Sequence, residues 1–182
     1  TDNTTDDALA ALAQQLETPT YRGSQDHVLE RAVRAAEVFG LDAFIRLCGD
    51  RPLFPLDEMS NAGQAMATAL DPADATDALD LVTNWPIHGA PPGLTTEVIR
   101  TRALRQILER GVNAQQREHL TQYFYEHPTQ FRILRLPPRR NQYHCPSFAV
   151  DTAMDLDNLN RIFSVSPAID LGVDEADHLY TG

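Results

Sequence analysis

The chain has 182 residues, of which 42% are hydrophobic and 23% are charged, and this is the composition of a globular domain with a sizeable core. Its net charge is −11, and all 15 basic residues are arginines, so the chain contains no lysine. An acidic chain repels phosphate backbones and anionic headgroups, which argues against nucleic-acid and membrane-surface binding, and no apolar run is long enough to cross a bilayer.

The N-terminus and the cysteines predict a cytoplasmic protein. Residues 1–7 are polar and acidic, unlike the basic and apolar start of a signal peptide. The cysteines, Cys48 and Cys145, are too few for a disulfide framework and form no CxxC pair. We therefore expect reduced thiols.

In the first half of the chain, apolar spacing and turn residues predict alternating helices and strands. Ser24 or Asp26 is placed to cap the second helix, and Gly40 is placed to end it. In chain order we expect a helix at 7–16, a strand at 18–21, a turn at 22–24, a helix at 26–39, a strand at 43–48, a helix at 57–69 and a strand at 79–84.

A loop rich in proline and glycine follows at 85–93, and the same alternation then continues. The dipeptide Pro137-Pro138 ends the fifth predicted strand, because proline cannot donate a hydrogen bond to a sheet. The elements expected here are a strand at 94–99, helices at 101–110 and 114–126, strands at 131–136 and 148–150, and a helix at 154–163.

This alternation predicts one α/β domain over residues 1–164. The acidic tail, 165–182, is expected to pack loosely or to contribute to an interface. Doubly wound domains usually open with a buried strand, a loop and a helix. Here the chain opens on polar residues that look like the loop after such a strand, so we expect the first layer of the fold to be absent.

Two aspartates are candidate metal ligands because each follows an apolar strand. Asp50 follows strand 43–48 through a glycine, and Asp151 follows strand 148–150 directly. Ligands of open α/β sheets bind beyond the carboxyl ends of the strands, and Mg²⁺ takes one or two carboxylates together with phosphate oxygens and water. The alternative is that each aspartate only caps the following helix or turn.

The segment from Tyr21 to Leu29 joins a predicted strand end, a glycine turn and a helix start. Backbone N–H groups at a helix start favour an anion, and Arg22 adds a fork of donors. The alternative reading is an ordinary helix start.

The histidines give weaker signals. Glu118 and His119 follow Arg117 on a predicted helix, where consecutive side chains fan out over different faces, so at most one or two of the three can face a pocket. His144-Cys145 is too little for a metal site.

Five segments, in this order, resemble the sugar cytidylyltransferase family that includes acylneuraminate and spore-coat-polysaccharide-type enzymes. Each segment alone is a weak signal, but five in the same order indicate homology. The segments are 21–31 (YRGSQDHVLER), 46–53 (RLCGDRPL), 92–98 (PGLTTEV), 117–128 (REHLTQYFYEHP) and 148–152 (FAVDT) with Asp155 and Leu156.

The resemblance implies a Rossmann-like three-layer α/β sandwich of the nucleotide-diphospho-sugar transferase type, commonly a homodimer. It implies transfer of CMP from CTP to an acidic or amino sugar, with release of pyrophosphate. By the same resemblance, Asp50 and Asp151 are the catalytic Mg²⁺ ligands. Arg22 and Ser24 would lie near the nucleotide, and Glu118 and His119 near the sugar.

Departures from the family leave alternatives open. The family's opening strand and its loop rich in Arg, Gly and Lys grip the triphosphate, and nothing in this chain resembles them. Cys48 and Arg51 flank the metal aspartate where smaller or less charged residues are usual, and Thr95-Thr96 replaces a more acidic pair. The chain is therefore an enzyme, a non-catalytic remnant that serves as a binding or dimerisation module, or an enzyme whose loop this chain leaves out.

Two further expectations concern the chain as a whole. The loop 85–93 is apolar and stiff for an exposed connection, so we expect it at or near a homodimer interface. With no triphosphate loop, we expect this chain to bind CTP weakly and to turn over slowly or not at all.

Overall fold

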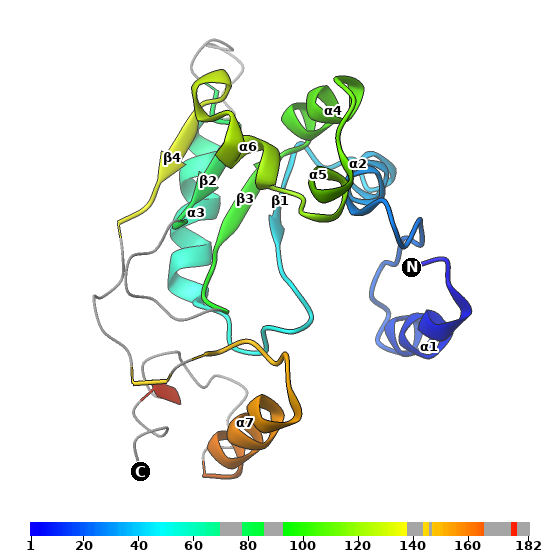
Figure 1. Ribbon diagram of the computed structural model, residues 1–182, viewed down its shortest axis with the longest axis vertical. Helices are drawn as coiled ribbons and strands as arrows, with labels where there is room; N and C mark the ends of the chain where they lie inside the picture. The colour runs from blue at the N-terminus through cyan, green and yellow to red at the C-terminus, as the bar shows by residue number, and fades with distance from the viewer. Residues whose placement is uncertain (70–77, 86–92, 138–143, 146, 166–175, 178–182) are drawn as a thin grey trace. The chain divides into compact units, whose positions relative to one another are not determined.

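The computed structural model describes residues 1–69, 78–85, 93–137, 144–145, 147–165 and 176–177, and its elements are labelled in Figure 1. In chain order they are η1 (Thr4–Asp6), α1 (Asp7–Gln15), α2 (Val28–Val38), β1 (Ala43–Arg46), α3 (Leu56–Thr68), β2 (Leu81–Thr83), β3 (Glu97–Arg100), α4 (Thr101–Glu109), α5 (Ala114–Glu118), α6 (Gln122–Glu126), η3 (Pro128–Gln130), β4 (Ile133–Arg135) and α7 (Ala153–Val165). No helix in these ranges is long and apolar enough to span a membrane.

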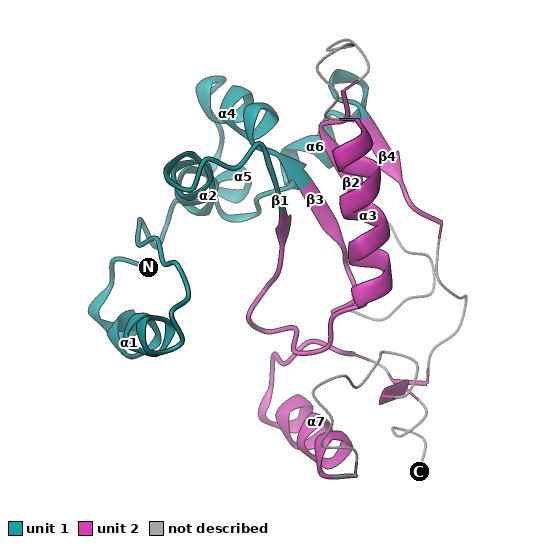
Figure 2. Ribbon diagram, turned by 180° about the vertical axis from the view of Figure 1, so that it is seen from behind, with its two compact units in different colours: residues 1–44, 99–132 teal, residues 45–98, 133–182 magenta. Residues whose placement is uncertain are grey.

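The chain divides into two compact units, coloured separately in Figure 2. Unit 1 consists of residues 1–44 and 99–132, and unit 2 of residues 45–98 and 133–182. Unit 1 contains the predicted residues Arg22, Ser24, Glu118 and His119, whereas unit 2 contains Asp50 and Asp151.

Unit 1 is built around α2, which packs against α4 and α5. Gly40 ends α2 as predicted, with a φ of 63°, and Leu41 N–H then donates to the carbonyl of Ala36 at 2.8 Å. The predicted cap is wrong, because the imidazole of His27 accepts from the N–H of Glu30 instead. The buried side chains on the facing helices α2 and α4 include Leu29, Val33, Ala36, Ala103, Leu104 and Ile107.

The predicted strand at 18–21 is wrong. Glu17 has a φ of 52°, and Thr18 N–H donates to the carbonyl of Ala13 at 2.8 Å, so this segment closes the end of α1. Pro19 has no N–H to offer a sheet.

The helix predicted at 114–126 is two short helices, α5 and α6. His119 is the C-cap of α5 and has an extended conformation, with φ −97° and ψ 95°. The chain then turns, and Leu120 and Thr121 are buried. Asn113 and Gln116 form a capping box at the start of α5, and Gln116 also donates to Glu126 at 2.6 Å.

A four-stranded sheet has the order β1-β3-β2-β4, and the unit boundary passes through β1 and β3. Strands β2 and β4 pair in parallel, with Leu81 opposite Ile133 and Thr83 opposite Arg135. All three residues of β2 are buried, and α3 packs against this strand. Parallel pairing and full burial are typical of the α/β class that the sequence predicts.

One expectation for the end of the chain is wrong. Residues 148–150 form no strand, because Ala149 N–H donates to the side chain of Ser147 and Val150 N–H donates to the carbonyl of Asp50. The tail, expected to pack loosely or to contribute to an interface, is described at residues 165 and 176–177, and Ala176 and Asp177 are fully buried. Asp177 accepts from the N–H groups of His144 and Cys145, both at 2.8 Å.

Candidate functional site

Asp50 lies on an exposed turn after β1. Arg51 N–H donates to the carbonyl of Cys48 at 3.1 Å, which closes the turn around Gly49 and Asp50. Leu53, two residues after Arg51, is buried and fixes the turn to the interior of unit 2. Asp50 is exposed, and its carboxylate accepts no hydrogen bond from any described residue.

Asp151 precedes α7, but it does not cap that helix. Thr152 and Asp155 form the cap, since Asp155 accepts from the N–H and the hydroxyl of Thr152, both at 2.8 Å. These bonds, with a weaker one from the N–H of Asp151, hold the pKa of Asp155 below its usual value. The carboxylate of Asp151 is exposed and accepts no hydrogen bond in the described part of the chain. Capping therefore does not explain either aspartate.

The Asp50 and Asp151 segments meet in unit 2, although about a hundred residues separate them in sequence. Val150 N–H donates to the backbone carbonyl of Asp50 at 2.8 Å, and Figure 1 shows the loop after β1 meeting the segment before α7. The predicted approach of the two aspartates is thus present at the level of the backbone. It comes from irregular loops rather than from the ends of two paired strands.

The described part of the third family-like segment, residues 93–98, lies against the Asp151 segment. Gly93 has a φ of 101°, and a Cβ there would come within 2.5 Å of the carbonyl carbon of Phe148 and 2.7 Å of the nitrogen of Ala149. Only glycine permits this approach, both because of the contact and because of the positive φ. Three of the five segments that carry the resemblance therefore converge in one unit.

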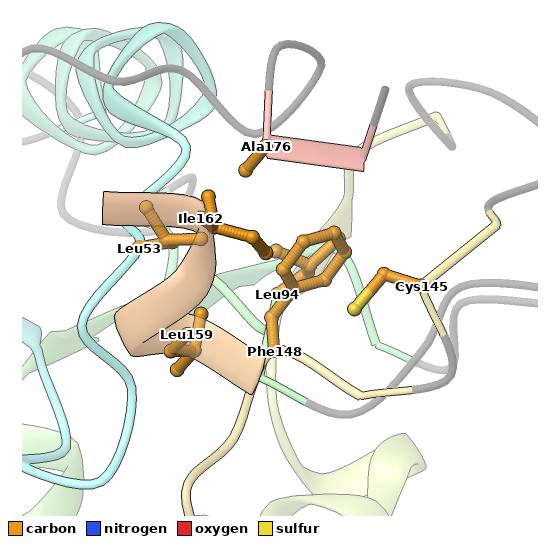
Figure 3. Close-up of a cluster of buried hydrophobic side chains, with 7 residues drawn as sticks. All are labelled: Leu53, Leu94, Cys145, Phe148, Leu159, Ile162 and Ala176. Carbon is orange, nitrogen blue, oxygen red and sulfur yellow. The ribbon is translucent and has the colours of Figure 1, made fainter. Parts of the chain in front are cut away.

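A hydrophobic cluster holds these three segments together (Figure 3). Leu53, Leu94 and Phe148 each belong to a different one of them and are at most 3% exposed. Burial raises the pKa of the Cys145 thiol, so this side chain serves as core rather than as a nucleophile. The other members of the cluster come from the loop before Phe148, from α7 and from the tail, and they are Cys145, Leu159, Ile162 and Ala176.

Asn84 is a positioning residue that the sequence analysis did not single out. Its buried side-chain NH₂ donates to Glu58 at 2.7 Å and to the carbonyl of Leu94 at 2.9 Å, and its side-chain oxygen accepts from Thr96 N–H at 2.8 Å. This amide therefore ties residues 94–96 to the end of β2 and to α3. A usable signal was present, since Asn84 directly follows an apolar strand just as Asp50 and Asp151 were expected to do.

The two free carboxylates fit a hard divalent cation. Both are exposed, and neither is paired with a described residue. Within the described ranges no three His, Cys, Asp or Glu side chains cluster as metal ligands. Mg²⁺ prefers one or two carboxylate ligands, with water and phosphate oxygens in the remaining coordination positions. Structural zinc instead needs all of its ligands from the protein.

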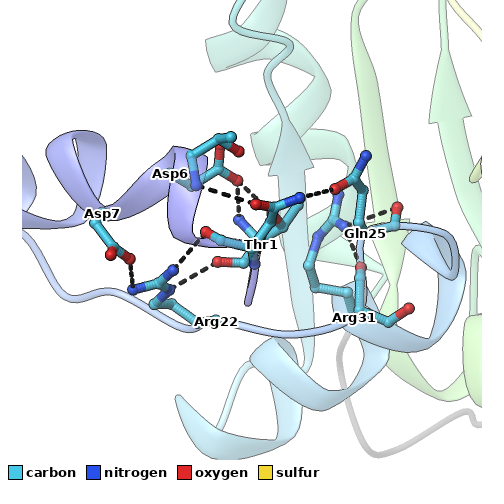
Figure 4. Close-up of polar contacts among 9 residues, drawn as sticks. Thr1, Asp6, Asp7, Arg22, Gln25 and Arg31 are labelled. Carbon is cyan, nitrogen blue, oxygen red and sulfur yellow. Dashed lines mark hydrogen bonds and ion pairs between the residues drawn. The ribbon is translucent and has the colours of Figure 1, made fainter.

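Arg22 is engaged by the N-terminal segment (Figure 4). Its Nε donates to the carbonyl of Thr1 at 2.7 Å, one terminal nitrogen donates to the carbonyl of Asn3 at 2.8 Å, and the other pairs with Asp7 at 2.7 Å. Ser24 accepts from the N–H of His27 at 3.2 Å. An anion at Arg22 would have to replace these partners.

Glu118 and His119 lie where α5 ends. His119 N–H donates to the carbonyl of Gln115 at 2.8 Å, and its own carbonyl accepts from Gln122 N–H at 3.0 Å. Both side chains are exposed, and neither has a hydrogen-bond partner among the described residues. They are accessible to a ligand.

Two curated proteins are similar to the chain in sequence. An uncharacterized protein of Methanocaldococcus jannaschii is 27% identical over 151 residues, which cover 82% of this chain and 58% of that protein. The spore coat polysaccharide biosynthesis protein SpsF of Bacillus subtilis is 29% identical over 170 residues, which cover 89% of this chain and 64% of that protein. The chain thus spans less than two thirds of the length of either relative, and no protein-family model matches it.

Among solved structures, a cytidylyltransferase from Leptospira borgpetersenii superposes with a TM-score of 0.87 at 19% sequence identity. The match covers 100% of this chain and 73% of that one. The predicted fold class is therefore confirmed, since a mixed α/β chain with a parallel strand pair aligns along its whole length with a cytidylyltransferase. The chain has the fold of a cytidylyltransferase, and the resemblance to sugar cytidylyltransferases that its motifs predict is confirmed.

Proposed function

We propose that the chain is the larger part of a Mg²⁺-dependent nucleotidyltransferase that moves CMP from CTP to an acidic or amino sugar for polysaccharide biosynthesis. In this reaction a sugar hydroxyl oxygen attacks the α-phosphorus of CTP and loses its proton. The bond from that phosphorus to the oxygen shared with the β-phosphate breaks, and pyrophosphate leaves. The observation that carries the proposal is the hydrogen bond between Val150 and Asp50, which brings two unneutralised carboxylate segments together.

Asp50 and Asp151 would hold the Mg²⁺ ion. When bound, the ion neutralises charge on the phosphates and on the departing pyrophosphate. The two aspartates hold it by their carboxylates, and the hydrophobic cluster beneath them fixes their backbones. Gly93 and Asn84 contribute by fixing residues 93–98 against Phe148.

The remaining roles in the proposal follow the family resemblance. Arg22 and Ser24 would bind the nucleotide, and Glu118 and His119, which are exposed and unpaired, would bind the sugar. The proposed enzyme is a cytoplasmic homodimer. Of the loop 85–93 expected at its interface, residues 86–92 lie outside the described part of the chain, and Trp85 is 46% exposed.

One observation favours the alternative of a binding or dimerisation module. Three of the five N–H donors of Arg22 are engaged by Thr1, Asn3 and Asp7, so only two remain for a phosphate. A chain that binds sugar but not CTP would have this second function.

The test is pyrophosphate release by the full chain with CTP, Mg²⁺ and a panel of acidic and amino sugars. We expect Asp50→Asn and Asp151→Asn each to lower the rate about a hundredfold, because each removes a charged ligand worth several kcal/mol in the transition state. A chelator of divalent cations should lower the wild-type rate similarly.

Asp157→Asn is the matched control. Asp157 is an exposed aspartate of α7, and its substitution removes the same charge. We expect its rate to equal that of the wild type. Turnover that persists in both Asp50→Asn and Asp151→Asn would exclude the metal site. Sugar binding without CTP binding would favour the binding module.

A further inference from the structure

Arg51 follows the proposed metal ligand Asp50, and its guanidinium has no partner among the described residues. Its Nε is buried and makes no hydrogen bond. The two terminal nitrogens make none either with the described residues, and they are not among the buried atoms, so they are open to a ligand. The side chain is therefore partly inserted into unit 2 while its charge remains unneutralised.

This state is unusual within the same chain. The described arginines that are not fully exposed otherwise have partners: Arg31 donates to the carbonyl of Ser24, Arg46 pairs with Glu97 at 2.7 Å, and Arg100 is also engaged. With 26 acidic residues against 15 arginines, an unneutralised and half-buried arginine is not explained by a shortage of carboxylates. A buried N–H without a partner is costly, and such groups call for an explanation.

Arg51 is held on the same turn as Asp50. Its own N–H closes that turn on Cys48, and the carbonyl of Asp50 is bound by Val150. Even so, Arg51 forms no ion pair with Asp50 or Asp151. Both signs of charge thus remain available on adjacent backbone segments, and a magnesium–polyphosphate complex presents both signs to a protein.

We propose that Arg51 binds phosphate oxygens of the nucleotide triphosphate and of the pyrophosphate formed from it. This inference rests on the proposed function. Arginine suits the role because its planar fork donates two parallel hydrogen bonds to phosphate. It is a substrate-binding residue beside the carboxylates, and it supplies positive charge in a chain that has no lysine.

The test compares Arg51→Met with wild type for binding of inorganic pyrophosphate and of CTP, each with Mg²⁺, by isothermal titration calorimetry. Methionine keeps the apolar part of the side chain and removes the donors. We expect the affinity for both ligands to fall about tenfold to hundredfold, as for the loss of one charge-assisted hydrogen bond. The melting temperature should stay the same or rise, because the unpaired buried Nε is removed.

Arg161→Met is the matched control, since Arg161 is exposed on α7 and loses the same charge. It should bind both ligands as the wild type does. Equal weakening by the two variants, or a lower melting temperature with unchanged affinity in Arg51→Met, would overturn the inference. If the wild type transfers CMP and Arg51→Met binds pyrophosphate normally, Arg51 is excluded while the proposed function stands. If pyrophosphate binding depends on Arg51 and no sugar accepts CMP, the inference stands and the proposed function fails.

Discussion

Asp151 and Asp155 lie four residues apart, yet their carboxylates have different surroundings. Asp155 accepts hydrogen bonds from Thr152 and from the backbone of Asp151, and so it is committed to the start of α7. Asp151 accepts none among the described residues. The capping role is therefore filled by the neighbour, and the charge of Asp151 is left for a ligand.

Asp155 gives a prediction about pH. Its folded-state pKa is lowered, first by the side chain and then by the backbone of Thr152. Its contribution to stability is therefore fully present above the unfolded pKa of about 3.9 and is lost as pH falls through the lower folded value. We expect Asp155→Asn to lower the free energy of unfolding at pH 7, and the difference from wild type to vanish in strong acid.

Urea unfolding at a series of pH values measures this difference. Asp157→Asn serves as the control on the same helix, and its difference from wild type should be small at every pH. A difference between Asp155→Asn and wild type that persists below the folded pKa would contradict the cap.

At the scale of the element, the sequence predicted helices better than the segments between them. Helices α1, α2, α3, α4 and α7 lie within one or two residues of their predicted bounds, because apolar periodicity and glycine stops are local signals. The strands at 18–21 and 148–150 were wrong because a strand needs a partner, and these residues bond to a helix end and to a loop instead. The break inside 114–126 occurs at His119, which has an extended conformation.

The candidate site was partly predictable, because some of its signals are local in sequence and others depend on tertiary neighbours. Asp50 and Asp151 were singled out as candidates from their positions after apolar runs, and the backbones of their segments do meet. The pairing of Arg22 with the N-terminal segment and the unpaired state of Arg51 depend on side-chain neighbours that sequence does not specify. Asn84 was missed because an amide at a strand end was not weighed alongside the carboxylates.

The packing of residues 93–98 on Phe148 gives a prediction at this scale. Gly93→Ala would place its Cβ within 2.5 Å of backbone and would strain a φ of 101°. We expect the free energy of unfolding to fall by about 2–4 kcal/mol, which is a large effect for a single substitution. Mg²⁺ affinity should fall as well, because the backbone of Phe148 must move and Asp151 follows three residues later.

The control for this change is Gly49→Ala, measured by urea unfolding. A Cβ at Gly49 meets nothing within 4 Å, so its stability should lie within about 0.5 kcal/mol of the wild type. Equal stability of the Gly93→Ala variant and the wild type would show that the Gly93 segment separates easily from Phe148. The packing of Gly93 would then not fix the Asp151 segment.

For the whole molecule, net charge opposes the association of two copies, whereas exposed apolar surface favours it. Each chain carries a net charge of −11, which keeps copies apart. Large apolar side chains are nevertheless exposed: Leu9 and Leu12 on α1, Leu16 at its C-cap, and Trp85 after β2. Leu9, Leu12 and Leu16 recur at helical spacing, so they form one stripe. Exposed apolar groups of this kind favour association.

We predict a homodimer at micromolar concentration whose association strengthens with salt. Two copies of this chain repel one another through their net charge, and raising the ionic strength from about 0.01 M to about 0.15 M shortens the Debye length from about 30 Å to about 8 Å. An interface of apolar side chains loses little by this screening, whereas one held by ion pairs would weaken. Sedimentation velocity at the two salt concentrations measures the change, and Trp85→Ser should weaken the dimer if the loop 85–93 contributes. A monomer at both salt concentrations would contradict the dimer, and dissociation at the higher one would point to an ionic interface.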